Sequence, residues 1–137
     1  MRNTKTIFAT LILSLFVTIE ARGESPQDYQ ILSTSRTSTM EKELNQKAAS
    51  GYRFLKVTNG PNIFGGKELI VVTVKDLGIA QQTRKYKVLR AGRNSDLQKK
   101  MQDASEDGYE YLDQTTLPNV FGGTDVIVVL ERTEPRE

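Results

Sequence analysis

One pattern occurs twice in this chain, at a constant spacing of 57 residues. Residues 61–66 (PNIFGG) return as residues 118–123 (PNVFGG), and an apolar run follows each copy. Between residues 29–75 and 86–132, 17 of 47 ungapped positions are identical. Ordinary residue usage would give about three identities. The chain is therefore predicted to be one structural unit written twice.

The first 23 residues have the features of an export leader. Arg2 and Lys5 give a positively charged start, an apolar segment spans residues 7–19, and small residues at positions 21 and 23 suit cleavage after Gly23. The apolar segment is shorter than the about 20 residues that cross a bilayer. We expect a cleaved signal peptide at residues 1–23, with an uncleaved anchor as the alternative. The mature chain is then periplasmic or secreted and has no stable membrane span.

The leader carries a net charge of +2, which equals the net charge of the whole chain, so residues 24–137 are neutral. A neutral chain gives no electrostatic case for binding nucleic acid. The two copies differ, because residues 29–75 hold seven basic and three acidic side chains and residues 86–132 hold six and eight. Opposite charges could help the halves face each other, but exposed ion pairs contribute only about 0–1 kcal/mol each.

The two copies are expected to share one interior. The chain has no cysteine and hence no disulfide. A unit of about 50 residues without a disulfide or a metal buries too little surface to be stable alone. Residues 24–137 are therefore predicted to form a single α+β domain made of two repeats, at about 29–75 and 86–132.

Each repeat is predicted to fold as strand, helix, strand, strand. A capping-box pattern at residues 38–41 would start the first helix, and a similar pattern at residues 95–98 the second. Gly51 and Gly108 would end the helices with positive φ. The matched residues Leu55 and Leu112 are expected in the core.

The apolar runs at residues 69–72 and 126–129 do not alternate with polar residues, which indicates central strands covered on both faces. Each repeat is thus predicted to form an antiparallel three-stranded sheet in the order 1-3-2, with one helix on one face. The other faces would meet, giving a pseudo-two-fold arrangement of helix, sheet, sheet, helix. The alternative is one continuous six-stranded sheet that leaves a face for a partner chain.

The front half of each repeat resembles the short bacterial βαββ domains of unknown function. The shared pattern is an aromatic-led strand, a helix ending in L-x-x-x-small-x-x-G, and an aromatic-acidic-aliphatic strand. Gly108-Tyr109-Glu110 fits this pattern better than Gly51-Tyr52-Arg53. The resemblance implies the fold and no activity.

The residue types present exclude several kinds of chemistry. Without histidine or cysteine the chain lacks Ser-His-Asp, Cys-His, thiol-redox and ordinary zinc sites. No glycine-rich loop precedes a helix in the manner of a phosphate loop. We predict no catalytic residue, no metal and no cofactor.

The repeated loop is the one candidate binding site. Its glycines permit a tight turn with positive φ, and its phenylalanine is expected to cap the edge of the core. Alternatively, the exposed backbone amides could hold an anion and the asparagines could add contacts. The candidate binding residues are Asn62, Phe64, Gly65, Gly66, Asn119, Phe121, Gly122 and Gly123.

Three functions remain open from the sequence. The first is an exported, non-catalytic binding or assembly module for an unknown protein or small ligand. The second is a small enzyme, such as an isomerase, that uses tyrosine and carboxylates in a pocket between the repeats. The third is a self-associating envelope protein, so that a homo-oligomer is possible.

Overall fold

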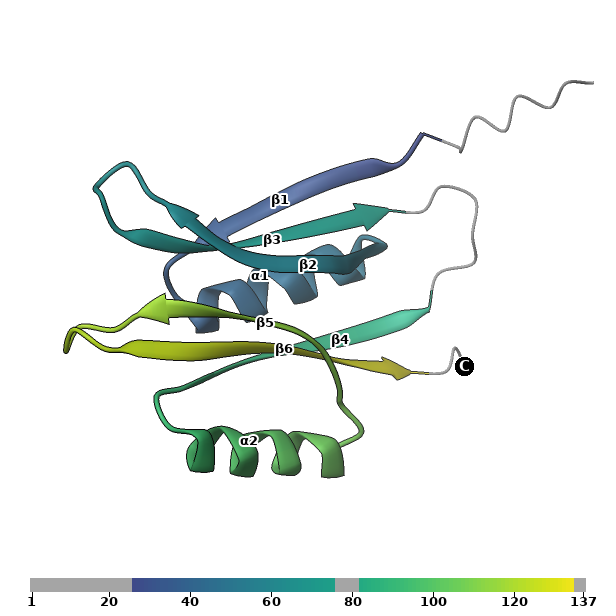
Figure 1. Cartoon of the computed structure of the whole chain (residues 1–137). Coiled ribbons are helices and arrows are strands. Elements are labelled where there is room, and N and C mark those ends of the chain that lie inside the picture. The colour runs from purple at the N-terminus through teal and green to yellow at the C-terminus, as the bar shows by residue number, and fades with distance from the viewer. Residues whose placement is uncertain (1–25, 76–81, 135–137) are drawn as a thin grey trace, which may run out of the picture.

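The computed structural model describes residues 26–75 and 82–134, so the expected signal peptide lies outside the described residues. The described chain contains two units with the same order of elements (Figure 1). The first unit comprises β1 (Asp28–Thr34), α1 (Thr37–Ala49), β2 (Tyr52–Pro61) and β3 (Lys67–Lys75). The second unit comprises β4 (Thr83–Ala91), α2 (Asn94–Glu106), β5 (Glu110–Pro118) and β6 (Thr124–Glu134).

The strands form two separate antiparallel sheets of three strands, in the orders β1-β3-β2 and β4-β6-β5. The predicted α+β class and the central position of each third strand are therefore confirmed, and a continuous six-stranded sheet is wrong. Each central strand is the most apolar strand of its sheet and has a strand on both sides.

The two helices begin one residue before the predicted cap. Arg36 and Arg93 occupy the N-cap positions without a side-chain hydrogen bond, so the predicted capping boxes at Ser38 and Ser95 are wrong. The Glu41 carboxylate, expected to fold back on its own helix, accepts the backbone N–H of Val88 on β4 instead. The C-terminal predictions are confirmed: Gly51 and Gly108 follow the helices with φ of 92° and 87°.

A bulge in β2 changes which side chains reach the core. The pairing of β2 with β3 shifts register between Phe54 and Lys56, so Leu55 is the extra residue. Phe54 and Val57 then face the same side and are buried, whereas Leu55 is 39% exposed. The same bulge lies at Leu112 on β5. The predicted core positions of both leucines are wrong, because strict alternation cannot reveal an inserted residue.

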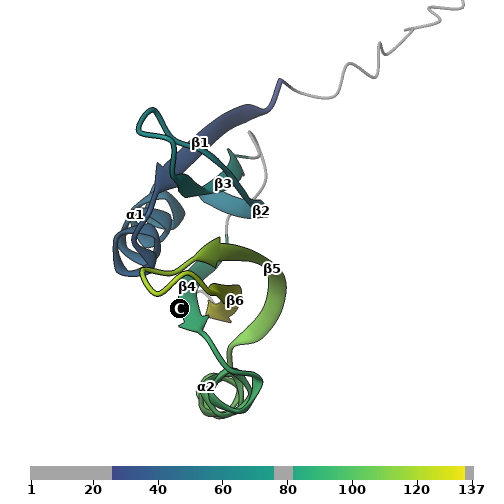
Figure 2. The ribbon, with the colours of Figure 1, turned by 60° about the vertical axis from the view of Figure 1, so that its left-hand side comes forward.

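Helix α1 packs on one face of the first sheet and along the β4 edge of the second sheet, while β2 lies beside β5, and α2 lies outside the second sheet (Figures 1 and 2). The two sheets and α1 thus enclose one interior, and the predicted pseudo-two-fold order of helix, sheet, sheet, helix is not observed. Side chains of α1 and of both sheets share one core, formed by Leu32, Met40, Leu44, Phe54, Val57, Leu69, Val71, Tyr86, Val88, Leu117, Ile127 and Val129.

The units therefore pack head to tail. The face of the first sheet that carries α1 meets the face of the second sheet that points away from α2. In β6, Ile127 and Val129 join the shared core while Val128 and Leu130 pack under α2, so both faces are covered as predicted. In β3 the outward residues Ile70 and Val72 are only partly buried, so the predicted cover on both faces is wrong for this strand.

Leu44→Ala is expected to lower the free energy of unfolding by about 2–5 kcal/mol, because Leu44 is 1% exposed and its loss leaves a cavity between two sheets. Met101→Ala, at the corresponding position of the outer helix, should cost less than half as much because Met101 is half-buried. Urea unfolding followed by circular dichroism measures both. Equal losses of stability in the two variants would contradict the conclusion that α1, unlike α2, lies in the interior.

Candidate functional site

The two predicted loops form the same tight turn. Asn62 Oδ1 accepts the backbone N–H groups of Phe64 and Gly66, both at 2.9 Å. Asn119 does the same at the second turn, and Gly65 and Gly122 both have φ of 80°. The predicted turn chemistry is confirmed, since positive φ is costly for any residue with a side chain.

The backbone amides of these turns are engaged within the turns. Besides the two N–H groups on Asn62 Oδ1, Gly65 N–H donates to Asn62 O at 3.2 Å and Asn62 N–H donates to Gly66 O at 2.8 Å. A Cβ on Gly66 would lie 3.0 Å from Asn62 Nδ2, so the second glycine makes room for the asparagine. The glycines thus make room for the asparagine side chain, and that side chain binds backbone amides that the alternative interpretation assigned to an anion.

The side chains at the tips of both turns point into solvent. Phe64 is 89% exposed and Phe121 is 93% exposed, so the predicted role of capping the core is wrong. Their neighbours Ile63 and Val120 are 92% and 93% exposed. Sequence reasoning missed these two residues, although an aliphatic residue stands at this position in both copies. Both tips project from the same end of the molecule (Figure 1). Together, the pairs Ile63-Phe64 and Val120-Phe121 are the apolar tips.

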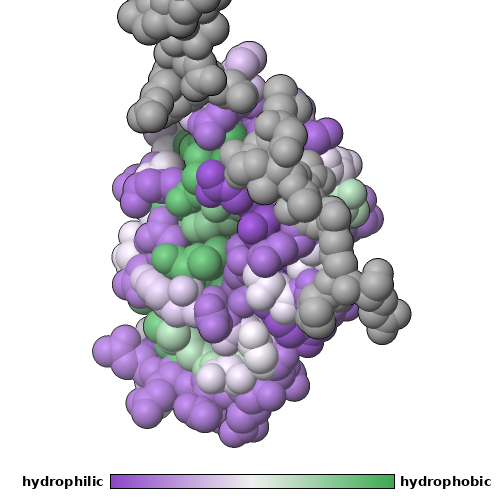
Figure 3. Space-filling view, turned by 90° about the vertical axis from the view of Figure 1, so that its right-hand side faces the viewer, coloured by the Kyte–Doolittle hydropathy of each residue, from purple (hydrophilic) through white to green (hydrophobic). Residues whose placement is uncertain are grey.

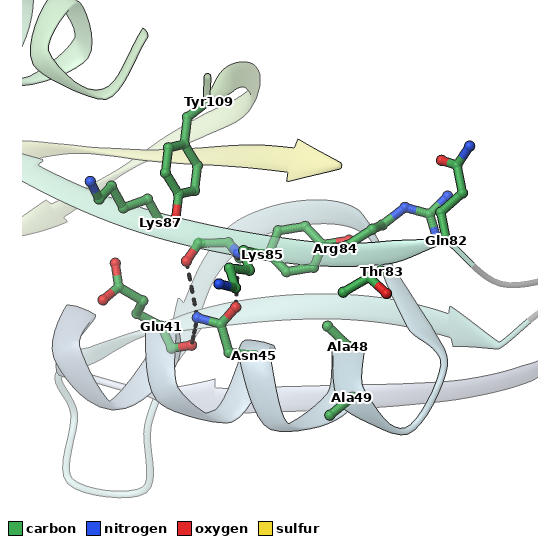
Figure 4. A pocket seen from close by; sticks show the side chains of 11 residues that line it. Glu41, Asn45, Ala48, Ala49, Gln82, Thr83, Arg84, Lys85, Lys87 and Tyr109 are labelled. Atoms are coloured by element: carbon green, nitrogen blue, oxygen red, sulfur yellow. Dashed lines mark hydrogen bonds between the residues drawn. The ribbon is translucent and has the colours of Figure 1, made fainter. Parts of the chain in front are cut away.

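Polar side chains of α1 satisfy the free edge of β4. Asn45 Nδ2 donates to Tyr86 O at 3.0 Å, and Asn45 Oδ1 accepts Tyr86 N–H at 2.8 Å (Figure 4). Glu41 accepts the Val88 N–H at 2.9 Å. An unpaired strand edge otherwise leaves its backbone groups to water or to another strand. The helix therefore takes the place of a neighbouring strand.

The second unit in turn satisfies the free edge of β2. The Tyr86 hydroxyl, in the buried core, accepts the Phe54 N–H at 3.0 Å, and Asp113 accepts the Val57 N–H at 3.1 Å. Burial raises the pKa of the Asp113 carboxyl, but the N–H groups of Val57 and Gln114 together with Lys56 outweigh it and hold the pKa below its ordinary value. No sequence motif identifies Tyr86 and Asp113 as residues that bond the edge of β2, because their partners are distant in the sequence.

A cavity of about 660 Å³ opens at the seam between α1 and β4 (Figure 4). Ala48 and Ala49 contribute an apolar part of its lining, and Arg84, Lys85 and Lys87 contribute cationic groups. These cations already have partners: Arg84 pairs with Glu131 at 3.4 Å, Lys85 with Glu134 at 3.2 Å and Lys87 with Asp107 at 3.7 Å. Each of these three cations thus already has a counter-charge within the chain.

A second cavity, of about 570 Å³, lies between α2 and β5 and is mainly apolar. We call it the outer groove; it is lined by Leu97, Gln98, Met101, Gln102, Tyr111 and Leu130, among others. In the space-filling view, separate apolar patches lie along one side of the molecule, and the lowest of them lies just above α2 (Figure 3).

Within the described residues, no group of three or more acidic side chains is placed to hold a metal ion. No helix in that part of the chain is long and apolar enough to cross a membrane. The chain matches no protein-family profile, and neither a curated protein nor a solved structure is significantly similar to it. The assignment of function therefore depends on the geometry alone.

Asn45→Ala is expected to destabilise the protein by about 1–3 kcal/mol, because it leaves the N–H and C=O of Tyr86 unpaired in a partly buried place. Native-state hydrogen exchange should show faster exchange of the Tyr86 amide. Gln102→Ala is the matched control at the corresponding position of α2, where the side chain is exposed, and should change stability by less than about 0.5 kcal/mol. Equal effects would contradict the role of Asn45 at the β4 edge.

Tyr86 should make the fold sensitive to alkaline pH. Burial raises the pKa of its phenol well above the ordinary value of 10.0. The neutral phenol is thus favoured in the folded state, and its contribution is complete below about pH 10 and declines as the unfolded chain ionises above it. Between about pH 8 and pH 11, the stability advantage of the wild type over Tyr86→Phe should shrink in urea titrations. A constant difference across this range would contradict burial of the phenol.

Proposed function

We propose that this chain is an exported, non-catalytic binding module that docks on a protein partner through its two apolar tips. The proposal depends on four large apolar side chains at the ends of two turns of the same form. Each of these side chains is about nine-tenths exposed. Adjacent apolar side chains that are exposed together on a surface often mark an interaction site.

The turns present the apolar tips in a fixed form. Because Asn62 and Asn119 hold the amides of both turns, little backbone freedom is lost when a tip enters a pocket. Two equal tips on one end of the molecule also permit bivalent binding, which raises the overall affinity without new contacts. The proposal includes the export signal at residues 1–23, a duplicated βαββ unit, and the βαββ-domain resemblance, all of which remain predictions.

A small-molecule site or catalytic pocket at the seam is the second candidate function. The cavity between α1 and β4 favours it, since a seam packed shut would leave no room for a ligand. Its acidic and amide groups, Glu41 and Asn45, are bound to the backbone of β4, which argues for a structural role. The apolar tips have no comparable structural use.

The double variant Phe64→Ser/Phe121→Ser tests the proposal. Both side chains are almost fully exposed, so the thermal midpoint should stay within a few degrees of the wild type. Envelope proteins captured by the immobilised wild type are identified, and one is purified and titrated against both forms. We expect its affinity for the double variant to be at least about tenfold lower, since apolar anchors dominate such contacts.

Leu55→Ser is the matched control, because Leu55 is a 39% exposed apolar side chain that lies outside both tips, and its replacement should leave this affinity unchanged. An equal affinity of wild type and double variant for every purified partner would overturn the proposal. Flotation of the wild type, but not of the double variant, with neutral phosphatidylcholine vesicles would instead assign the tips to a lipid surface.

A further inference from the structure

The first sheet has an apolar face that no described element covers. Its residues on the side away from α1 include Tyr29, which is 56% exposed, and Ile31, which is 67% exposed, with Ile70 and Val72 beside them. We call this the open sheet face. β1 is also the outer strand of its sheet, so one edge of its backbone faces away from β3.

The open sheet face corresponds residue by residue to a surface that is buried in the second unit. At the spacing of 57 residues, the four residues match those of the second sheet that pack on α1. The pairs are Tyr29 with Tyr86, Ile31 with Val88, Ile70 with Ile127, and Val72 with Val129. The open sheet face thus has a large apolar residue at each of the four positions that are in the core in the second unit.

The outer groove corresponds in the same way to the surface that receives Tyr86 and β4 in the first unit. Leu97 and Met101 stand where Met40 and Leu44 lie on α1, and Tyr111 stands where Phe54 lies on β2. The two side chains that bind the β4 edge, Glu41 and Asn45, have amide counterparts in Gln98 and Gln102. Donor and acceptor capacity for a strand edge is therefore present on α2 as well.

We propose that a second copy of this chain docks its open sheet face and β1 edge into the outer groove, repeating the internal interface between molecules. Tyr29 of one molecule enters the groove of the next, as Tyr86 does between α1 and β2. Gln102 bonds the backbone N–H and C=O of Tyr29, and Gln98 accepts the N–H of Ile31, by analogy with Asn45 and Glu41.

Charge favours this head-to-tail contact over a contact between like ends. The unit with the open sheet face has a net excess of basic side chains, and the unit with the outer groove has a net excess of acidic ones. Lys56 and Asp113, which pair at 3.6 Å across the internal interface, stand at corresponding positions. The same translation therefore places an Asp113 of one molecule near a Lys56 of the next, again with opposite charges.

The interface joins two different surfaces, so it is heterologous and leads to rings or open filaments rather than to a symmetric dimer. It goes beyond the proposed function, because it uses neither apolar tip. Each added molecule would present another pair of tips, which would increase the valency of the assembly.

Sedimentation velocity over a wide range of protein concentration tests the proposal on residues 24–137, which include every described element. The wild type should form species larger than a dimer, growing with concentration. Ile31→Glu disrupts only the open sheet face and Met101→Glu only the outer groove, so each alone should be monomeric. An equimolar mixture should form a one-to-one dimer, because each variant retains the surface that the other has lost.

A monomeric wild type at all concentrations would overturn the proposal, and so would a mixture that stays monomeric while both variants keep the circular dichroism spectrum of the wild type. Self-association of either variant alone would show a symmetric contact and would also contradict it. A covalent test does not depend on stability: the chain has no cysteine, so oxidised Ile31→Cys/Gln98→Cys should give a ladder of oligomers, and each single variant no more than a dimer.

Phe64→Ser/Phe121→Ser should associate like the wild type. This result separates the two proposals, because loss of partner binding through the tips and loss of stacking would arise from different variants. A double variant that no longer associates would assign self-association to the tips and overturn the stacking geometry.

Discussion

The contact between helix α1 and strand β4 is the interaction on which the rest of the structure depends. A helix usually packs one apolar stripe on one sheet and turns its polar side to water. Here Met40 and Leu44 are buried in the core, while Glu41 and Asn45 bond the edge of a strand that belongs to the other unit. The polar side chains satisfy backbone groups that burial would otherwise leave unpaired. The two units thus share one interior, even though their sheets remain separate.

Much of the local structure could be predicted because it depends on residues close in sequence. The apolar runs identify β3 and β6 as central strands, and Gly51 and Gly108 mark the ends of the helices by their positive φ. The capping box of the first helix was mispredicted, since Glu41 has a competing partner that is distant in sequence. The bulge at Leu55 was not predicted either, because an inserted residue in a strand is of a type that strands ordinarily contain and leaves no sign in the sequence pattern.

The order of layers could not be predicted from the repeat. Identical residues fold into similar units, but identity does not say which faces of the units meet. Ile70 and Val72 on β3 have the same types as Ile127 and Val129 on β6, yet only the second pair lies in the shared core. A two-fold arrangement and a head-to-tail arrangement both cover apolar strands, and the choice between them depends on the fit of whole surfaces. The exposure of Phe64 and Phe121 escaped prediction for a similar reason, since an aromatic residue beside a strand is more often buried.

Head-to-tail packing, unlike two-fold packing, leaves the molecule with two different ends. Stacked repeat proteins usually close their ends with repeats whose outer faces are polar. Here Tyr29 and Ile31 keep an apolar character at one end, and Leu97 and Met101 line an open groove at the other. In a single molecule these residues contribute less to stability than the residues of the shared core, because water still reaches them. These residues match the residues of the internal interface. The match is explained if the two ends also form an interface, between one molecule and the next.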